Sequence, residues 1–231
     1  MPDSLVVAED VERVFGAVAA RAVAVQHATF RIDAGELIAL TGPSGSGKST
    51  LLHLIGGLDF PTSGMLSWPG LGPRGTLRPS NVVNIFQGPS LIAPISVVDN
   101  VALPMLLAGV QPREAEARAI RELNRLRIGR LALKLPEAIS GGESQRAAIA
   151  RALAIRPKLI LADEPTGQLD SATAMQVMDV LLRSAQELGA AMVVSTHDER
   201  VAARLPVQWS IHAGQLITPQ VGALASPVPN P

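Results

Sequence analysis

The chain has 231 residues, and its 20 Lys and Arg residues balance its 20 Asp and Glu residues, so the net charge near pH 7 is zero. A balanced charge provides no broad basic field for nucleic acid or anionic lipid, and we expect no nucleic-acid partner. The absence of cysteine excludes disulfides and favours a reducing compartment. A hydrophobic content of 47% suffices for a buried α/β core. No apolar run has the length of a membrane-spanning helix, and we expect no secretory signal.

Two segments near the N-terminus combine β-branched residues with alternating polarity. Leu5 to Val7 and Val23 to Ile32 show this pattern, which is typical of antiparallel strands. We expect these strands to flank the main sheet.

A phosphate-binding loop follows an apolar run at residues 36–40 that indicates a buried strand. The loop consists of Gly42, Pro43, Ser44, Gly45, Ser46, Gly47, Lys48, Ser49 and Thr50, and residues 51–55 continue as a helix, which is the context that this pattern requires. The glycines let the backbone approach a phosphate, whose oxygens the helix N-terminus stabilises. Lys48 is expected to reach the β- and γ-phosphates, and the Ser49 hydroxyl to bind Mg²⁺. The sequence therefore predicts binding of a nucleoside triphosphate.

The middle of the chain changes from loop to strand and then to helix. Residues 68–80 are rich in Pro and Gly, which predicts an exposed loop. An apolar strand at 82–86 ends at Gln87. From about residue 90 to 142 the pattern is helical, with Pro112 at a first turn.

A second candidate anion site begins a helix at the end of this region. Ser140 is suited to cap the helix, while Gly141 and Gly142 carry no side chains that would block an approaching phosphate. On their own these residues are also an ordinary capping arrangement.

Two carboxylates follow the apolar strand predicted at 158–162. Open α/β sheets bind ligands at the carboxyl ends of their strands, so Asp163 is placed to hold Mg²⁺ through water. Glu164 is expected to face the γ-phosphate and polarise the attacking water.

The last part of the chain repeats the alternation of helix and strand. An amphipathic helix is predicted from Asp170, its expected N-cap, to Leu188, with Gly189 as its stop. A strand at 192–196 then places His197 at its carboxyl end. A hairpin is expected around Ala213 and Gly214.

All these motifs occur once and in an order that resembles the ATP-binding cassette (ABC) ATPases, from about Leu5 to Ile217. The resemblance implies an α/β P-loop NTPase fold with a mainly parallel core sheet, an antiparallel β subdomain and a helical subdomain. It implies one domain over residues 1–220, with a RecA-like core at about 1–89 and 152–220, a helical subdomain at about 90–151, and a flexible Pro-containing tail at 221–231.

The resemblance also assigns roles. Gln87 would contact Mg²⁺ and the lytic water, and His197 would sense the γ-phosphate and support Glu164. Ser140 to Gly142 would cover a nucleotide held by a partner subunit, and Asp170 would lie in a loop that communicates between the two sites of a dimer. Phe15 stands where the family usually places a Tyr against adenine. A phenyl ring supplies the same stacking face, although a core position is equally compatible with the sequence.

A finer resemblance rests on residues 57–59, 61–64, 100–104, 107–110 and 162–167. These look like the branch of macrolide exporters, lipoprotein-release ATPases and the cell-division ATPase, which we describe as MacB/LolD/FtsE-like. It implies an ATP- and Mg²⁺-dependent homodimer at the cytoplasmic face of the cell membrane, bound to an FtsX/MacB-like permease and driving export or the translocation of lipoproteins, peptides or drugs.

Two alternatives remain open. An FtsE-like regulator that moves no solute would share every catalytic residue. A soluble ABC protein acting on DNA or ribosomes is disfavoured by the neutral charge, the single cassette and the lack of a coiled-coil insertion.

Overall fold

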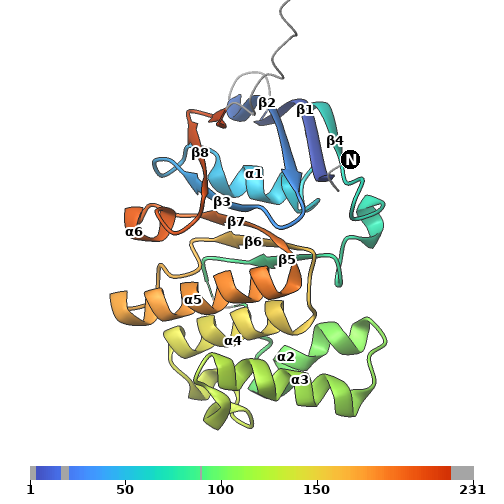
Figure 1. The fold of residues 1–231 in the computed structure, drawn as a ribbon, viewed down its shortest axis with the longest axis vertical. Coiled ribbons are helices and arrows are strands. Elements are labelled where there is room, and N and C mark those ends of the chain that lie inside the picture. Colours follow the sequence, from blue (N-terminus) through green and yellow to red (C-terminus); the bar gives the residue numbers. More distant parts are fainter. Residues whose placement is uncertain (1–3, 17–20, 89, 220–231) are drawn as a thin grey trace, which may run out of the picture.

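The computed structural model describes residues 4–16, 21–88 and 90–219. Within these ranges the strands form one nine-stranded sheet in the order β4-β1-β2-β9-β8-β3-β7-β6-β5 (Figure 1). The strands are β1 (Ser4–Phe15), β2 (Ala22–Asp33), β3 (Leu37–Thr41), β4 (Ser63–Ser67), β5 (Val82–Ile85), β6 (Leu159–Asp163), β7 (Ala191–Ser195), β8 (Val207–His212) and β9 (Gln215–Ile217).

The sheet has a parallel part and an antiparallel part. β8, β3, β7, β6 and β5 pair in parallel, whereas β1 pairs antiparallel with both β2 and β4. β8 and β9 form the hairpin predicted at Ala213 and Gly214, both of which have positive φ, as a type I′ hairpin turn requires. The predicted fold class, a mainly parallel core with an antiparallel β subdomain, is confirmed.

The central parallel strands β3, β7 and β6 are largely apolar and buried, because layers of the structure cover both of their faces. Ile38 and Leu40 belong to one buried cluster together with the leucines of α1 (Lys48–Ile55). Leu37 and Ala39 belong to a second cluster on the opposite face, shared with α5 (Ser171–Leu188). Figure 1 shows α1 between the antiparallel strands and the core sheet, and α5 beyond the sheet. Alternate residues of one strand therefore hold two layers in place.

The helical subdomain lies at the end of the molecule opposite the antiparallel strands (Figure 1). It contains α2 (Val97–Leu107), α3 (Pro112–Arg125) and α4 (Gly141–Ala154). Pro112 occupies the first turn of α3, as predicted. Buried residues of all three helices belong to the same apolar cluster as the core strands. This continuous packing is what ties the helical subdomain to the sheet.

The ends of α5 agree with the sequence prediction. The Asp170 carboxylate accepts hydrogen bonds from the backbone N–H groups of Ala172 and Thr173 at 3.1 and 3.0 Å, and Gly189 ends the helix in the left-handed conformation. The short helix α6 (Glu199–Ala202) follows β7.

The prediction of an exposed loop at residues 68–80 is wrong in part. Leu71 and Leu77 are buried in the cluster around α1, and the indole N–H of Trp68 donates to the Ile55 carbonyl at 2.7 Å. Pro and Gly set the irregular backbone of this segment, but its spaced apolar side chains decide its burial.

Two further expectations concern the C-terminal tail and the absence of a membrane-spanning helix. The tail predicted at 221–231 lies outside the described residues. Among the residues that are described, no helix has the length and apolarity needed to cross a membrane.

The apolar cluster between α3 and the core predicts the effect of truncating Leu123, which is fully buried. Leu123→Ala should lower the free energy of unfolding by about 2–5 kcal/mol, because the cavity left behind cannot refill completely. Denaturant titration measures this change. Leu133→Ala is the control, since Leu133 is 87% exposed and its truncation should stay within about 0.5 kcal/mol. Equal effects of the two changes would contradict the assignment of the core.

Candidate nucleotide-binding and catalytic site

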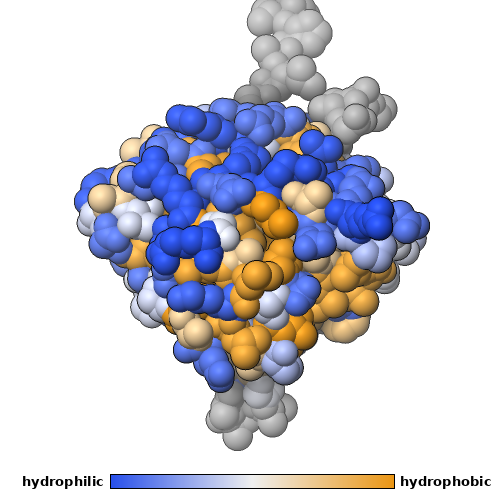
Figure 2. Space-filling model, turned by 90° about the horizontal axis from the view of Figure 1, so that it is seen from below, coloured by the Kyte–Doolittle hydropathy of each residue, from blue (hydrophilic) through white to orange (hydrophobic). Residues whose placement is uncertain are grey.

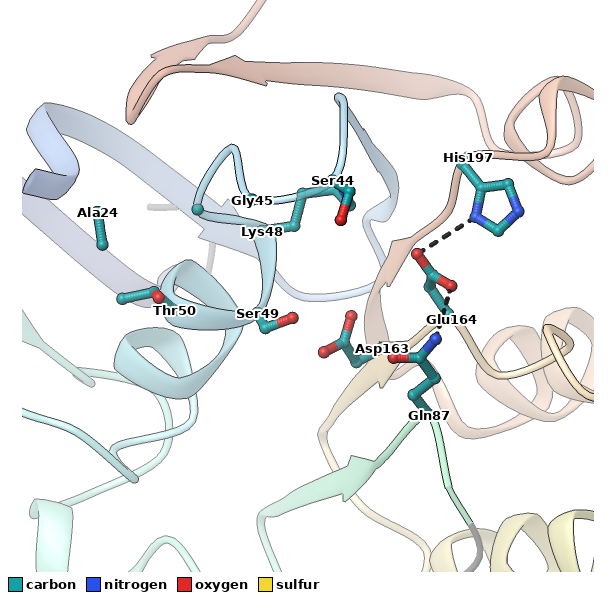
Figure 3. A pocket seen from close by; sticks show the side chains of 11 residues that line it. Ala24, Ser44, Gly45, Lys48, Ser49, Thr50, Gln87, Asp163, Glu164 and His197 are labelled. Carbon is teal, nitrogen blue, oxygen red and sulfur yellow. Dashed lines mark hydrogen bonds and ion pairs between the residues drawn. The ribbon is translucent and has the colours of Figure 1, made fainter. Parts of the chain in front are cut away.

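The parallel register brings four predicted motifs to one edge of the sheet. Leu40 of β3 pairs with Ser195 of β7, and Asp163 of β6 pairs with the same Ser195. Because these strands point the same way, the segments that follow them meet at their carboxyl ends. A cavity of about 440 Å³ opens there (Figure 3), lined by Ala24, Ser44, Gly45, Gly47, Lys48, Ser49, Thr50, Gln87, Asp163, Glu164 and His197.

The backbone of the loop between β3 and α1 packs closely against two neighbouring carbonyl groups. Gly47 has φ of 110°, and a Cβ atom there would lie 2.1 Å from the Ala24 carbonyl oxygen. A Cβ on Gly42, with φ of 149°, would lie 2.2 Å from the Ile211 carbonyl oxygen. Only glycine is tolerated at these two positions.

Two features of this loop fit a bound phosphate. Helix α1 starts at Lys48 without a side-chain cap among the described residues and has no acidic residue in its first turn, so its N-terminal N–H groups remain free for an anion. The Ser46 hydroxyl is buried, and the described part of the chain gives it no hydrogen-bond partner. The Lys48 ammonium donates to the carbonyls of Gly42 and Pro43 at 2.8 and 2.9 Å, which holds its charge inside the loop.

The Glu164 carboxylate is held from two sides (Figure 3). Its Oε2 accepts a hydrogen bond from Gln87 Nε2 at 3.1 Å. Its Oε1 lies 3.2 Å from Nδ1 of His197. The three side chains proposed as catalytic thus form one cluster, and each carboxylate oxygen retains a lone pair for a further donor such as water.

Ser195 is a functional residue that the sequence analysis did not identify. Glu164 has φ of 45°, an unfavourable conformation for a residue with a side chain. Its N–H donates to both the carbonyl and the hydroxyl of Ser195, at 3.1 and 3.2 Å. The Ser195 hydroxyl also donates to Asp163 Oδ1. One buried serine therefore positions both carboxylates, and its only sequence signal is a small polar residue in an apolar strand.

The side chains predicted to bind metal share the same cavity. Ser49, Gln87 and Asp163 supply a hydroxyl, an amide and a carboxylate. Such oxygen donors suit Mg²⁺ bound together with phosphate oxygens.

The residues predicted for a second nucleotide, Ser140, Gly141 and Gly142, lie outside this cavity, and we call them the signature residues. The Ser140 hydroxyl accepts from the Glu143 N–H at 3.3 Å, and the Glu143 carboxylate accepts from the Ser140 N–H at 3.0 Å. This backbone hydrogen bond is the main factor that lowers the Glu143 pKa. Gly141 and Gly142 open α4 next to Gln168 and Leu169, so the signature helix and the segment before Asp170 are neighbours. None of the three signature residues lines the cavity around Lys48.

Asp170 and Phe15 also lie apart from the cavity lining. Asp170 caps α5, and its pKa is lowered by hydrogen bonds, first from the Thr173 side chain. Phe15 is 42% exposed, so the alternative of a core position is wrong. The Arg13 guanidinium lies 4.2 Å from the centre of its ring. Stacking of Phe15 on adenine stays a prediction.

Comparison with known proteins identifies similar chains. A sequence profile described as "ABC transporter" matches residues 25–167. The chain is 45% identical over 193 residues to the lipoprotein-releasing system ATP-binding protein LolD of Legionella pneumophila (strain Paris), covering 80% of this chain and 85% of the relative. It is 38% identical to LolD of Hydrogenovibrio crunogenus, covering 95% and 98%. A solved dimer of the ATP-binding cassette MJ0796 in a post-hydrolysis state, bound to ADP and Pi, aligns with a TM-score of 0.85 and 32% identity, covering 93% of this chain and 98% of that one.

The geometry of the loop predicts that Gly47→Ala abolishes tight nucleotide binding, since the new methyl group would collide with the Ala24 carbonyl. We expect the dissociation constant for a fluorescent ATP analogue to rise at least about tenfold, or 1.4 kcal/mol. Gly75→Ala is the matched control, because a Cβ there meets nothing within 4 Å and Gly75 does not have positive φ. Unchanged affinity in Gly47→Ala would show that the loop does not form the binding site.

Proposed function

The chain belongs to the ATP-binding subunits of ABC transporters, and we propose that two copies of it hydrolyse ATP together to drive a separate membrane permease. This proposal rests on the fact that the motifs of one chain do not all line the same cavity. The phosphate loop and Gln87, Asp163, Glu164 and His197 line one cavity, whereas the Ser140 helix start lies outside it. A complete site then requires the signature residues of a second chain.

We propose the following roles within one cavity. The loop and Lys48 bind the β- and γ-phosphates, while Ser49, Gln87 and Asp163 hold Mg²⁺, which would neutralise the charge that develops on the phosphates. Glu164 accepts a proton from the attacking water. Gln87 and His197, whose nitrogens lie 3.1 and 3.2 Å from the two carboxylate oxygens, keep Glu164 oriented toward that water.

The partner copy would complete the site from the far side of the nucleotide. Ser140, Gly141 and Gly142 present the N-terminus of α4, where backbone N–H groups favour an anion. Glu143 and Ser140 form a reciprocal capping pair that holds this start rigid. The similar cassette MJ0796 is a dimer in its structure, which supports self-pairing of this chain. Asp170, close behind Gln168 and Leu169 beside the signature glycines, is proposed to relay between the two sites.

For the transported substrate we propose a lipoprotein. The relatives at 45% and 38% identity are named as lipoprotein-releasing ATP-binding proteins, which favours this role over drug export and over an FtsE-like regulator. The chain would act at the cytoplasmic face of the membrane, held there by an FtsX/MacB-like permease.

An apolar cavity is proposed as the docking site for a cytoplasmic segment of that permease. It has a volume of about 280 Å³ and lies between the sheet edge and the helical subdomain, where Leu58, Phe86, Pro104 and Ala148 line it. Phe86 immediately precedes Gln87, so a segment seated here would touch the chain that carries a catalytic side chain. Figure 2 shows further hydrophobic side chains gathering on the helical end of the molecule, and Leu106 and Leu107 of α2 are among the exposed ones.

Replacing the proposed base tests the hydrolytic mechanism. Glu164→Gln should lower the turnover of ATP about 10²- to 10⁴-fold, since the amide cannot accept the proton of water, while the affinity for ATP stays near that of the native chain. Steady-state phosphate release and nucleotide titration measure the two quantities. Glu116→Gln makes the same chemical change on the exposed face of α3 and should leave turnover unaltered. Turnover within about twofold of native in Glu164→Gln would overturn the assignment.

A charge in the apolar cavity tests the docking site. Leu58→Asp, at a side chain that is 41% exposed, should weaken co-purification with a co-expressed FtsX/MacB-like permease, because the new carboxylate would be desolvated on binding. Leu133→Asp, on a side chain outside this cavity, is the control and should bind normally. ATP affinity serves to show that both variants are folded. Equal retention of the permease by both variants would place the partner elsewhere.

A further inference from the structure

Gln145 lies inside α4 and joins two segments that carry catalytic side chains. Its side chain is 1% exposed. The amide nitrogen donates to the Phe86 carbonyl at 3.1 Å and to the Pro165 carbonyl at 3.2 Å. Phe86 directly precedes Gln87, and Pro165 directly follows Glu164. One amide thus fixes the spacing of the two peptides whose side chains meet at 3.1 Å in the catalytic cluster.

The orientation of this amide is determined by its surroundings. Turning it over would set its oxygen against two carbonyl oxygens, which cannot donate a hydrogen bond. In the observed orientation Oε1 is buried and has no partner in the described part of the chain. A buried polar atom without a partner is unfavourable, so an apolar residue of similar size would suit this position better if it served packing alone.

Helix α4 also forms hydrogen bonds with the segment that follows Gln87. The Arg151 guanidinium donates to the Ser90 carbonyl at 2.8 Å and to the Ser90 hydroxyl at 2.5 Å. Burial lowers the pKa of Arg151 from its usual value. The helix therefore contacts the chain on both sides of Gln87, with two side chains that lie about 1.7 helical turns apart.

The other end of α4 is the signature. Ser140 caps the helix only five residues before Gln145, and the intervening residues are helical. A helical turn is stiff compared with a loop, so a displacement of its first turn also moves the side chain one turn later. Contact between the signature residues and a nucleotide would therefore also displace the side chain of Gln145.

We infer that Gln145 is a positioning residue that sets Gln87 against Glu164 and links the signature end of α4 to the catalytic carboxylate of the same chain. The link between the two nucleotides of a dimer rests on the function proposed above. The local part, the spacing of Gln87 and Glu164, rests on the hydrogen bonds of one chain.

The variant Gln145→Met tests this inference, because Met is close in size but cannot donate to the two carbonyls. We expect kcat for ATP to fall about 10- to 100-fold, the usual effect of losing an outer-shell contact at a metal-binding site, since Gln87 is a proposed Mg²⁺ ligand. KM should change by less than about threefold, since the phosphate loop is untouched. A residue that served packing alone would instead lower stability and leave kcat near native.

Gln208 offers a matched control. Its side-chain amide also bridges two backbone carbonyls, those of Ala202 and Leu205, at 2.9 and 2.7 Å, but neither carbonyl adjoins Gln87 or Glu164. Gln208→Met should therefore keep kcat near native. If Gln145→Met does not fold, Gln145→Asn replaces it, because the shorter amide cannot reach both carbonyls.

A double variant separates the possible outcomes. If Gln145 acts through Glu164, then Gln145→Met combined with Glu164→Gln should be no slower than Glu164→Gln alone. Multiplied losses, or kcat within about twofold of native in folded Gln145→Met, would overturn the inference. Rapid turnover in Glu164→Gln alone would instead overturn the proposed base, and the two failures are thus distinguishable.

Discussion

The site depends on the parallel alignment of β3, β7, β6 and β5. Residues in register on these strands, such as Leu40, Ser195 and Asp163, bring segments from distant parts of the sequence to a common edge. The alignment is stable because both faces of the strands are buried, one against α1 and the other against α5 and the helical subdomain. With a single covered face, strands this apolar would expose hydrophobic surface to water. The catalytic geometry is therefore a consequence of how the core is packed.

At that edge, local strain and polar contacts determine the chemistry. A non-glycine residue with positive φ costs about 1–3 kcal/mol and persists only where its surroundings fix it. Glu164 is such a residue, and the two acceptors of Ser195 fix its N–H while Gln87 and His197 fix its carboxylate. The same arrangement connects the catalytic cluster to α4 through Gln145. Helix α4 therefore links two proposed sites. Its N-terminus would cover a partner's nucleotide, and its Gln145 contacts the segments of the side chains proposed to act on the chain's own nucleotide.

Local chemistry explains which parts of this arrangement could be predicted from the sequence. The phosphate loop follows from glycine spacing, the caps at Ser140 and Asp170 from short polar side chains before helices, and the end of α5 from Gly189. These features depend on residues a few positions apart. The strand-end positions of Gln87, Asp163 and His197 follow from the apolar runs before them, whereas the roles expected of Gln87 and His197 come from the family resemblance.

Other parts depend on contacts between distant segments. Nothing in the apolar run around Ser195 indicates that its hydroxyl lies against Asp163. A glutamine within a helix gives no sign that its amide bridges two loops, as Gln145 does. The burial of Leu71 and Leu77 likewise follows from the position of α1 and not from the Pro- and Gly-rich segment that contains them. Such contacts join segments that are far apart in the sequence, so they can be recognised only once the fold is known.

The proposed mechanism requires a second copy of the chain to complete the site. The most direct measurement is the molar mass of Glu164→Gln by light scattering during gel filtration, with and without Mg-ATP. We expect a monomer without nucleotide and a dimer with it, because slow hydrolysis traps the shared site in its bound form. A mass that stays monomeric with Mg-ATP, although nucleotide binding is shown separately, would contradict it.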